Sequence, residues 1–92
     1  MHVYHGVNVG KPVYAGITDD IARRQLQHGD RFVLDQLTPA AGVTRGQARA
    51  IEEALIVRNP GFQNLRHEVS PRHSWYQDTL DWGHDWLTGQ GL

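Results

Sequence analysis

Two tyrosines and an arginine–histidine pair are the residues of this chain whose types and spacing suit proton transfer and anion binding. Tyr4 and Tyr14 lie in two runs that alternate between apolar and polar residues, and Arg24 precedes His28 by four positions. A spacing of four puts two side chains on one face of a helix. Tyrosine and histidine can donate and accept protons, and arginine binds phosphate or carboxylate through two parallel hydrogen bonds. These residues form a candidate site if their elements bring them to one place.

One carboxylate joins this set because of its position on a predicted helix. On a helical wheel of residues 45–58, Glu52 falls in the middle of the apolar face, and Glu53 falls well off it. That face is defined by Ala48, Ile51, Leu55 and Ile56. An ionised carboxylate in an apolar stripe is costly unless it is paired or binds a cation. Glu52 is therefore a buried partner for an arginine, a metal ligand or a general base, and we expect Glu53 to face solvent.

The two alternating runs, HVYHGVNV and PVYAGI, predict a β-hairpin. A three-residue loop, Val9–Gly10–Lys11, keeps the apolar side chains of both strands on one face, whereas a slip of one residue would mix the faces. This register sets Tyr4 opposite Gly16 and Gly6 opposite Tyr14. The two tyrosines then share the other face, and the glycines leave open space beside them.

A short helix and a third strand follow the hairpin. Thr18 is predicted as the N-cap of a helix that runs to about His28, with Gly29 as its stop. Residues 31–38 are rich in strand-forming residues and predict the third strand.

Two capping boxes predict two further helices. The motifs TRGQ at 44–47 and SWYQ at 74–77 open helices over 45–58 and to about residue 87. The last helix carries a broad apolar stripe. We expect its three tryptophans to lie in the core: Trp75, Trp82 and Trp86.

The order β-β-α-β-α-α predicts an α+β domain over residues 1–92, with a small three-stranded, mainly antiparallel sheet flanked by helices.

The composition of the chain bears on its partners. The formal net charge of −1 argues mildly against a nucleic-acid partner, because proteins that bind nucleic acid are usually basic. Eight of its nine basic residues are arginine, which favours phosphate or carboxylate recognition. The absence of cysteine excludes disulfides and cysteine-ligated zinc, and no apolar run approaches the roughly eighteen residues of a membrane span.

Together these motifs resemble the GIY-YIG nuclease superfamily over essentially the whole chain. The segments HVY (2–4) and YAG (14–16) stand where that family has GIY and YIG, with His2 and Ala15 as departures. The family's catalytic arginine, ten residues after the second tyrosine, matches Arg24, and the histidine or tyrosine four residues later matches His28. The family's E-x-x-L-I run matches EEALI, which selects Glu52, and its asparagine is best matched by Asn64.

This resemblance implies a metal-dependent endonuclease that hydrolyses nucleic-acid phosphodiester bonds, with DNA favoured over RNA. One divalent cation, Mg²⁺ or Mn²⁺, is expected at Glu52. The expected catalytic residues are Tyr4 as general base, Tyr14, Arg24, His28 and Glu52. Substrate contacts are expected from Asn64, Lys11 and, at the phosphate rim, Arg23.

The segments VYAGITDDIARR, ARAIEEALI and NLRHEVSP are similar in style to nuclease domains at the C-termini of bacterial polymorphic toxins. That similarity implies a monomeric domain carried by a larger secreted protein into the cytoplasm of a target cell, and a cognate immunity protein that protects the producer. The alternatives are an RNA-cleaving toxin, a catalytically silent nucleic-acid- or protein-binding module of the same fold, and an unrelated small α+β domain.

Overall fold

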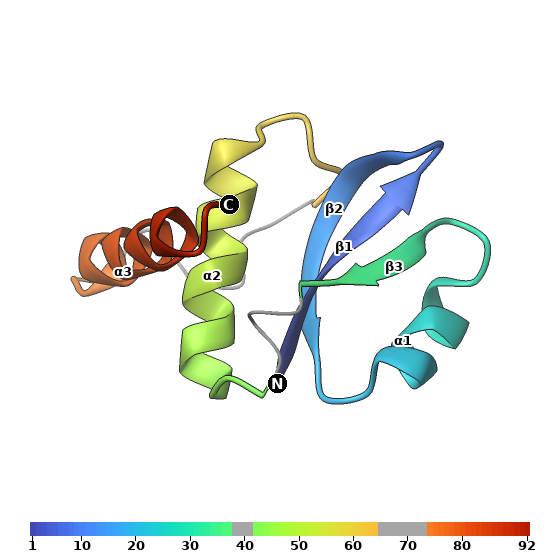
Figure 1. Cartoon of the computed structure of the whole chain (residues 1–92), viewed down its shortest axis with the longest axis horizontal. Coiled ribbons are helices and arrows are strands. Elements are labelled where there is room, and N and C mark those ends of the chain that lie inside the picture. The colour runs from blue at the N-terminus through green and yellow to red at the C-terminus, as the bar shows by residue number, and fades with distance from the viewer. Residues whose placement is uncertain (38–41, 65–73) are drawn as a thin grey trace.

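The computed structural model of the chain describes residues 1–37, 42–64 and 74–92 (Figure 1). Within them the α+β class and the three-stranded sheet are confirmed, and the sheet is antiparallel throughout. The elements in chain order are β1 (His2–Asn8), β2 (Lys11–Thr18), α1 (Ile21–His28), β3 (Val33–Gln36), α2 (Arg45–Arg58) and α3 (Tyr76–Gly89). The predicted end of the third strand at residue 38 lies outside the described residues.

The sheet has the order β2-β1-β3, so the first strand is central. Its register with β2 sets Tyr4 opposite Gly16 and Gly6 opposite Tyr14, as the alternation predicts. Since side chains alternate across a strand, both tyrosines lie on one face of the sheet and the apolar side chains of the hairpin lie on the other.

The predicted three-residue hairpin loop is wrong. Asn8 pairs with Lys11, and the two-residue turn between them has φ angles of 51° at Val9 and 74° at Gly10. Positive φ at both central positions is the geometry of a tight hairpin turn that matches the twist of the strands. A bulge restores the predicted register beyond the turn, because β2 carries one extra residue, Val13, where the pairing shifts.

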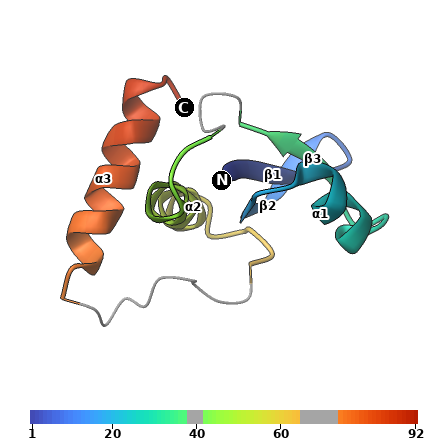
Figure 2. The same cartoon turned by 90° about the horizontal axis from the view of Figure 1, so that it is seen from below.

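Helix α2 lies between the sheet and α3, as Figure 2 shows. It packs on the sheet face that carries Val3, Ala15 and Ile17, and these side chains form the main core with the buried side of α2. Helix α1 lies on the other side of the sheet, where the tyrosines are, and none of its residues is buried (Figure 2). The capping box of Thr44 and Gln47 opens α2 with both of its hydrogen bonds formed, as predicted.

The start of α1 differs from the prediction. Thr18 is the last residue of β2 and stays paired with His2, so it is extended and buried and does not cap the helix. Asp20 is the N-cap instead, and its side chain accepts a hydrogen bond from the Arg23 amide. The predicted stop at Gly29 is confirmed, with a φ of 60°.

Helix α3 packs on α2 through different residues from the tryptophans that the sequence indicates. It begins at Tyr76 without a side-chain cap, so the capping box predicted at Ser74 does not form. Trp75 and Trp82 are exposed and Trp86 is half-buried, because α3 packs on α2 through the narrow stripe of Leu80, Gly83 and Leu87. The prediction that all three tryptophans lie in the core is therefore wrong.

The packing of α3 also buries Glu53, which was predicted to face solvent. Glu53 is 1% exposed, and its Oε2 accepts a hydrogen bond of 2.7 Å from the Tyr76 hydroxyl. Burial and this contact with Glu53 raise the pKa of Tyr76 to about 12. In the part of the chain that the structure describes, no helix has the length and apolar character to cross a membrane.

The close approach of α2 and α3 makes one stability prediction. A Cβ at Gly83 would overlap the Ala50 carbonyl oxygen and lie 3.0 Å from the Cβ of Ala54, so Gly83→Ala must push the helices apart. We expect the free energy of unfolding to fall by about 1–3 kcal/mol, the usual cost of overpacking.

The matched control is Gly46→Ala in α2, where an added Cβ meets nothing within 4 Å. It should leave stability unchanged or raise it by about 0.5–1 kcal/mol, the helix preference of alanine over glycine. Urea unfolding of both variants makes the comparison, and equal effects would show that α3 does not pack on α2 as described.

Candidate active site

Tyr4 is the centre of the cluster that the sequence predicts. Its side chain is fully buried, and its hydroxyl oxygen lies 3.0 Å from Nε2 of His28. Burial is the main reason that the pKa of Tyr4 rises to about 12, and the neighbouring Tyr14 and Glu52 act in the same direction. Arg24 opposes them through its charge and a side-chain hydrogen bond. Tyr4 is therefore a neutral phenol at neutral pH.

The two glycines of the hairpin give the aromatic rings their places. A side chain at Gly16 would overlap the Tyr4 ring, and a Cβ at Gly6 would lie 2.9 Å from the Phe32 ring. The predicted open space is thus filled from two sides. Tyr14 stacks on Phe32 with ring centres 5.2 Å apart, and these rings form one layer between the sheet and α1.

His28 closes this layer from the end of α1. Its ring meets Tyr14 and Phe32 edge to face, with ring centres 5.5 and 5.3 Å apart. Burial first, and then the charges of Arg24 and Arg31, lower the pKa of His28 below its ordinary value of 6.5. The ring is therefore neutral at pH 7 and can accept a hydrogen bond. Nε2 lies within hydrogen-bond distance of the Tyr4 hydroxyl and accepts its proton when the ring carries its own proton on Nδ1.

Arg24 and Arg23, adjacent on α1, have different surroundings. Arg24 is half-buried and acts on both Tyr4 and His28. Arg23 is exposed on another side of α1 and forms a 2.8 Å ion pair with Asp19. An exposed pair of this kind contributes little to stability. The structure thus brings Tyr4, Tyr14, His28 and Arg24 together and leaves Arg23 outside the cluster.

Gln25 fixes the position of α1, which has only eight residues. Its Nε2 donates to the Phe32 carbonyl at 2.7 Å, and its Oε1 accepts from the Leu34 amide at 2.8 Å. The side chain thereby ties the helix to the start of β3. Sequence reasoning missed both Gln25 and Phe32. The open space beside Gly6 was the signal for a large ring such as Phe32, but nothing local marks Gln25.

Glu52 lies on α2 and is 4% exposed. Its Oε1 is 3.2 Å from Nη1 of Arg49, which matches the interpretation of a buried carboxylate paired with an arginine. Its charge also reaches Tyr4, where it raises the pKa. Glu52 is therefore close enough to the tyrosine cluster to act on it electrostatically.

A metal ion at Glu52 would have few protein ligands. The described residues contain no group of three histidine, aspartate or glutamate side chains that could hold an ion. Mg²⁺ usually keeps several waters and takes one or two carboxylates together with substrate phosphate oxygens. The single buried carboxylate of Glu52 fits that mode of binding, and the metal site stays a prediction.

Asn64 and Lys11 have different surroundings. Asn64 donates from Nδ2 to the Ala15 carbonyl at 2.8 Å, and its Oδ1 accepts from the Ala15 amide at 3.1 Å. The side chain therefore continues the sheet at the open edge of β2. Lys11 is exposed at the start of β2, beside the hairpin turn and at the opposite end of that strand from α1 (Figure 1). Substrate contacts by these two residues stay predictions.

The fold and the cluster define a small α+β domain in which a buried tyrosine contacts a half-buried histidine beside an arginine. No family model, curated protein or solved structure matches the chain. The GIY-YIG resemblance therefore depends on the motifs themselves and on the positions of their side chains.

Two half-buried histidines predict how stability depends on pH. His28 and His5 both have a pKa lowered below 6.5 in the fold, chiefly by burial. As the pH falls through 6.5, the unfolded chain binds protons that the folded chain does not, so the free energy of unfolding falls. Above 6.5 this contribution to stability is fully present.

We expect His28→Gln to reduce the loss of stability between pH 7.5 and 5.5, measured by urea unfolding. An NMR titration of the wild-type ring proton should give His28 a midpoint below 6.5. A midpoint above 6.5 would contradict the assignment of a neutral acceptor beside Tyr4.

Proposed function

We propose that the domain is a metal-dependent endonuclease that hydrolyses phosphodiester bonds, with DNA as the favoured substrate and RNA as the alternative. The observation that carries this proposal is the cluster of Tyr4, His28 and Arg24. In it a neutral phenol lies in hydrogen-bond contact with a neutral imidazole, and the charge of one guanidinium acts on both. Hydrolysis of a phosphodiester needs transfer of a proton from water and stabilisation of the charge that develops on the phosphate.

Tyr4 and His28 supply the proton path in this mechanism. The high pKa of Tyr4 and its complete burial make it a poor base by itself. Its hydroxyl lies 3.0 Å from His28 Nε2, and in the tautomer with Nδ1 protonated that nitrogen accepts the hydroxyl proton. The oxygen can then take a proton from water as it passes its own to the imidazole. The histidine must therefore be neutral before reaction, which agrees with its lowered pKa.

Arg24 supplies the charge that the phosphate needs. It is positioned beside Tyr4, and its guanidinium can hold two phosphate oxygens. Its half-buried position strengthens this interaction relative to one in bulk water. The half-buried Tyr14 adjoins His28 and can orient the attacking water.

Glu52 is the residue that would hold the divalent cation, Mg²⁺ or Mn²⁺. When bound, the cation neutralises phosphate charge and favours the hydroxide form of a bound water. Arg49 of the same helix supplies the counter-charge of Glu52, with Nη1 3.2 Å from Oε1.

The toxin context is part of the same proposal. The similarity of the sequence motifs to polymorphic-toxin nuclease domains favours delivery into the cytoplasm of a target cell, and a cognate immunity protein as partner. The second candidate is a catalytically silent nucleic-acid- or protein-binding module of the same fold. The complete enclosure of Tyr4 and the pairing of Glu52 with Arg49 favour it, because both residues have their partners within the chain.

The first test compares two adjacent arginines. Arg24→Ala should lower the rate of cleavage by a factor of about 10²–10³, the usual effect of removing one donor that stabilises transition-state charge. Arg23→Ala removes an exposed charge outside the cluster and should change the rate little.

The assay uses supercoiled plasmid DNA and a structured RNA, each with Mg²⁺ or Mn²⁺ and with EDTA. Cleavage with metal alone supports the nuclease proposal and identifies the substrate. Binding without cleavage on both nucleic acids would support the silent module, and equal losses in the two variants would contradict the assigned role of Arg24.

The second test compares the two adjacent glutamates of α2. Glu52→Gln should abolish metal-dependent cleavage, because it removes the carboxylate charge that holds the cation. Glu53→Gln is the control, since the amide oxygen can still accept the hydrogen bond from Tyr76. Paramagnetic broadening by Mn²⁺ in NMR spectra measures binding separately from activity, and unchanged broadening around residue 52 in Glu52→Gln would exclude this metal site.

A further inference from the structure

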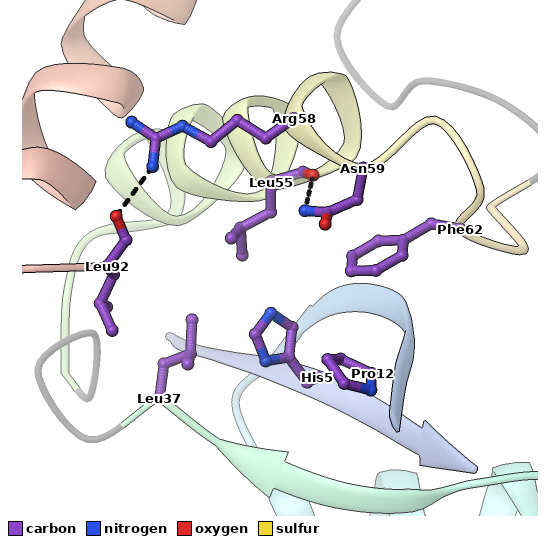
Figure 3. Close-up of a pocket in the computed structure, with 8 residues that line it drawn as sticks. All are labelled: His5, Pro12, Leu37, Leu55, Arg58, Asn59, Phe62 and Leu92. Carbon is purple, nitrogen blue, oxygen red and sulfur yellow. Dashed lines mark hydrogen bonds between the residues drawn. The ribbon is translucent and has the colours of Figure 1, made fainter. Parts of the chain in front are cut away.

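A pocket of about 300 Å³ lies on the sheet face opposite Tyr4, beside the C-terminal end of α2 (Figure 3). Its volume is at the lower end of the range of about 300–1,000 Å³ for small-molecule sites in proteins. The lining residues are His5, Pro12, Leu37, Leu55, Arg58, Asn59, Phe62 and Leu92. Because most of these side chains are apolar, the pocket suits a ligand that is largely apolar itself.

His5 places one unpaired polar atom at this pocket. Its Nε2 is buried and has no hydrogen-bond partner among the residues that the structure describes. Buried polar atoms in proteins nearly always have a partner, and an unmade hydrogen bond is costly. Burial lowers the pKa of His5 although Asp35 opposes it, so the ring is neutral at pH 7. A neutral ring with its proton on Nδ1 offers Nε2 as an acceptor.

Asn59 adds a second acceptor on the other side of the pocket. Its Nδ2 donates to the Leu55 carbonyl at 2.7 Å, which fixes the orientation of the amide. The oxygen of the same amide is turned toward the pocket and the His5 ring (Figure 3). The Phe62 ring stands edge to face with the His5 ring, with centres 6.0 Å apart, and forms a flat apolar wall.

Arg58 does not make the pocket an anion site. Its guanidinium donates to Nδ1 and the carbonyl of His84, to the Thr88 hydroxyl and to the Leu92 carbonyl. All three of its nitrogen atoms are thus engaged on the α3 side. With the His5 proton on Nδ1, the polar atoms that remain directed to the pocket are acceptors, so a ligand needs a donor and no charge.

We propose that this pocket binds a flat, uncharged aromatic molecule of one or two rings that carries an N–H or O–H donor, of the indole or phenol class. The ring lies against Phe62 and Leu55, and the donor pairs with Nε2 of His5. The inference is independent of the proposed nuclease activity, because none of the residues that line the pocket is assigned a role in that activity.

The test uses indole and its near-isostere indene, which lacks the N–H group. Each is titrated into the whole 92-residue chain and followed by ¹⁵N–¹H NMR. We expect saturable shifts confined to the residues that line the pocket, with indene bound about fivefold more weakly, the factor that one neutral hydrogen bond contributes. Equal affinities would overturn the assigned hydrogen bond, and the absence of saturable shifts at the pocket would overturn the site.

Two variants make the test specific. His5→Phe keeps a ring but removes Nε2, so indole and indene should bind with equal affinity. Leu37→Trp fills the pocket and should abolish binding of both. Val33→Ala, at an exposed position outside the pocket, is the control and should bind indole as the wild type does. A fivefold preference for indole that persists in His5→Phe would contradict the proposal.

Discussion

The layer of rings over Gly6 and Gly16 is the interaction on which the candidate site depends. A helix of eight residues is marginal in water by itself, and α1 buries no residue of its own. What holds it on the sheet is the contact of His28 with the rings of Tyr14 and Phe32, together with the bonds of Gln25 to β3. Each aromatic pair contributes about 0.5–1.5 kcal/mol beyond the burial of its surface. The same rings that stabilise the fold therefore set the distance between Tyr4 and His28.

Helix α2 carries two adjacent buried carboxylates, and each has a partner from a different direction. Glu52 is paired with Arg49 of its own helix, whereas Glu53 accepts a hydrogen bond from Tyr76 of α3. A buried carboxylate is tolerated only when it is paired or hydrogen-bonded. Helix α2 is covered by the sheet on one side and by α3 on the other. Its sequence therefore lacks the single apolar face of an amphipathic surface helix.

The position of α2 between the sheet and α3 explains which features the sequence could predict. Local patterns were sufficient for the pairing of Tyr4 with Gly16, for the capping box of α2 and for the inward position of Glu52. The failures have a tertiary cause. The exposure of the tryptophans and the burial of Glu53 depend on how α3 approaches α2, and the close contact at Gly83 decides that approach.

The predictions for the start of α1 and for the hairpin turn were wrong for a related reason. Thr18 is a good capping residue, but sheet pairing with His2 outweighs its local preference. At the turn, Val9 takes a positive φ that its side chain disfavours, and the pairing on both sides of it maintains that conformation. Conformational propensity is a property of one residue type, whereas pairing with the neighbouring strand determines the backbone conformation of both Thr18 and Val9.

The central strand connects the two faces of the molecule. Tyr4 directs its hydroxyl to His28 on one side, and the adjacent His5 directs its ring to the pocket on the other. Burial acts on both, raising the pKa of Tyr4 and lowering that of His5, so each stays neutral. In a strand buried on both faces, neutral hydrogen-bonding groups cost less than charged ones. The chemistry available on either face is therefore the transfer or sharing of a proton, and the arginines around α1 provide the charge.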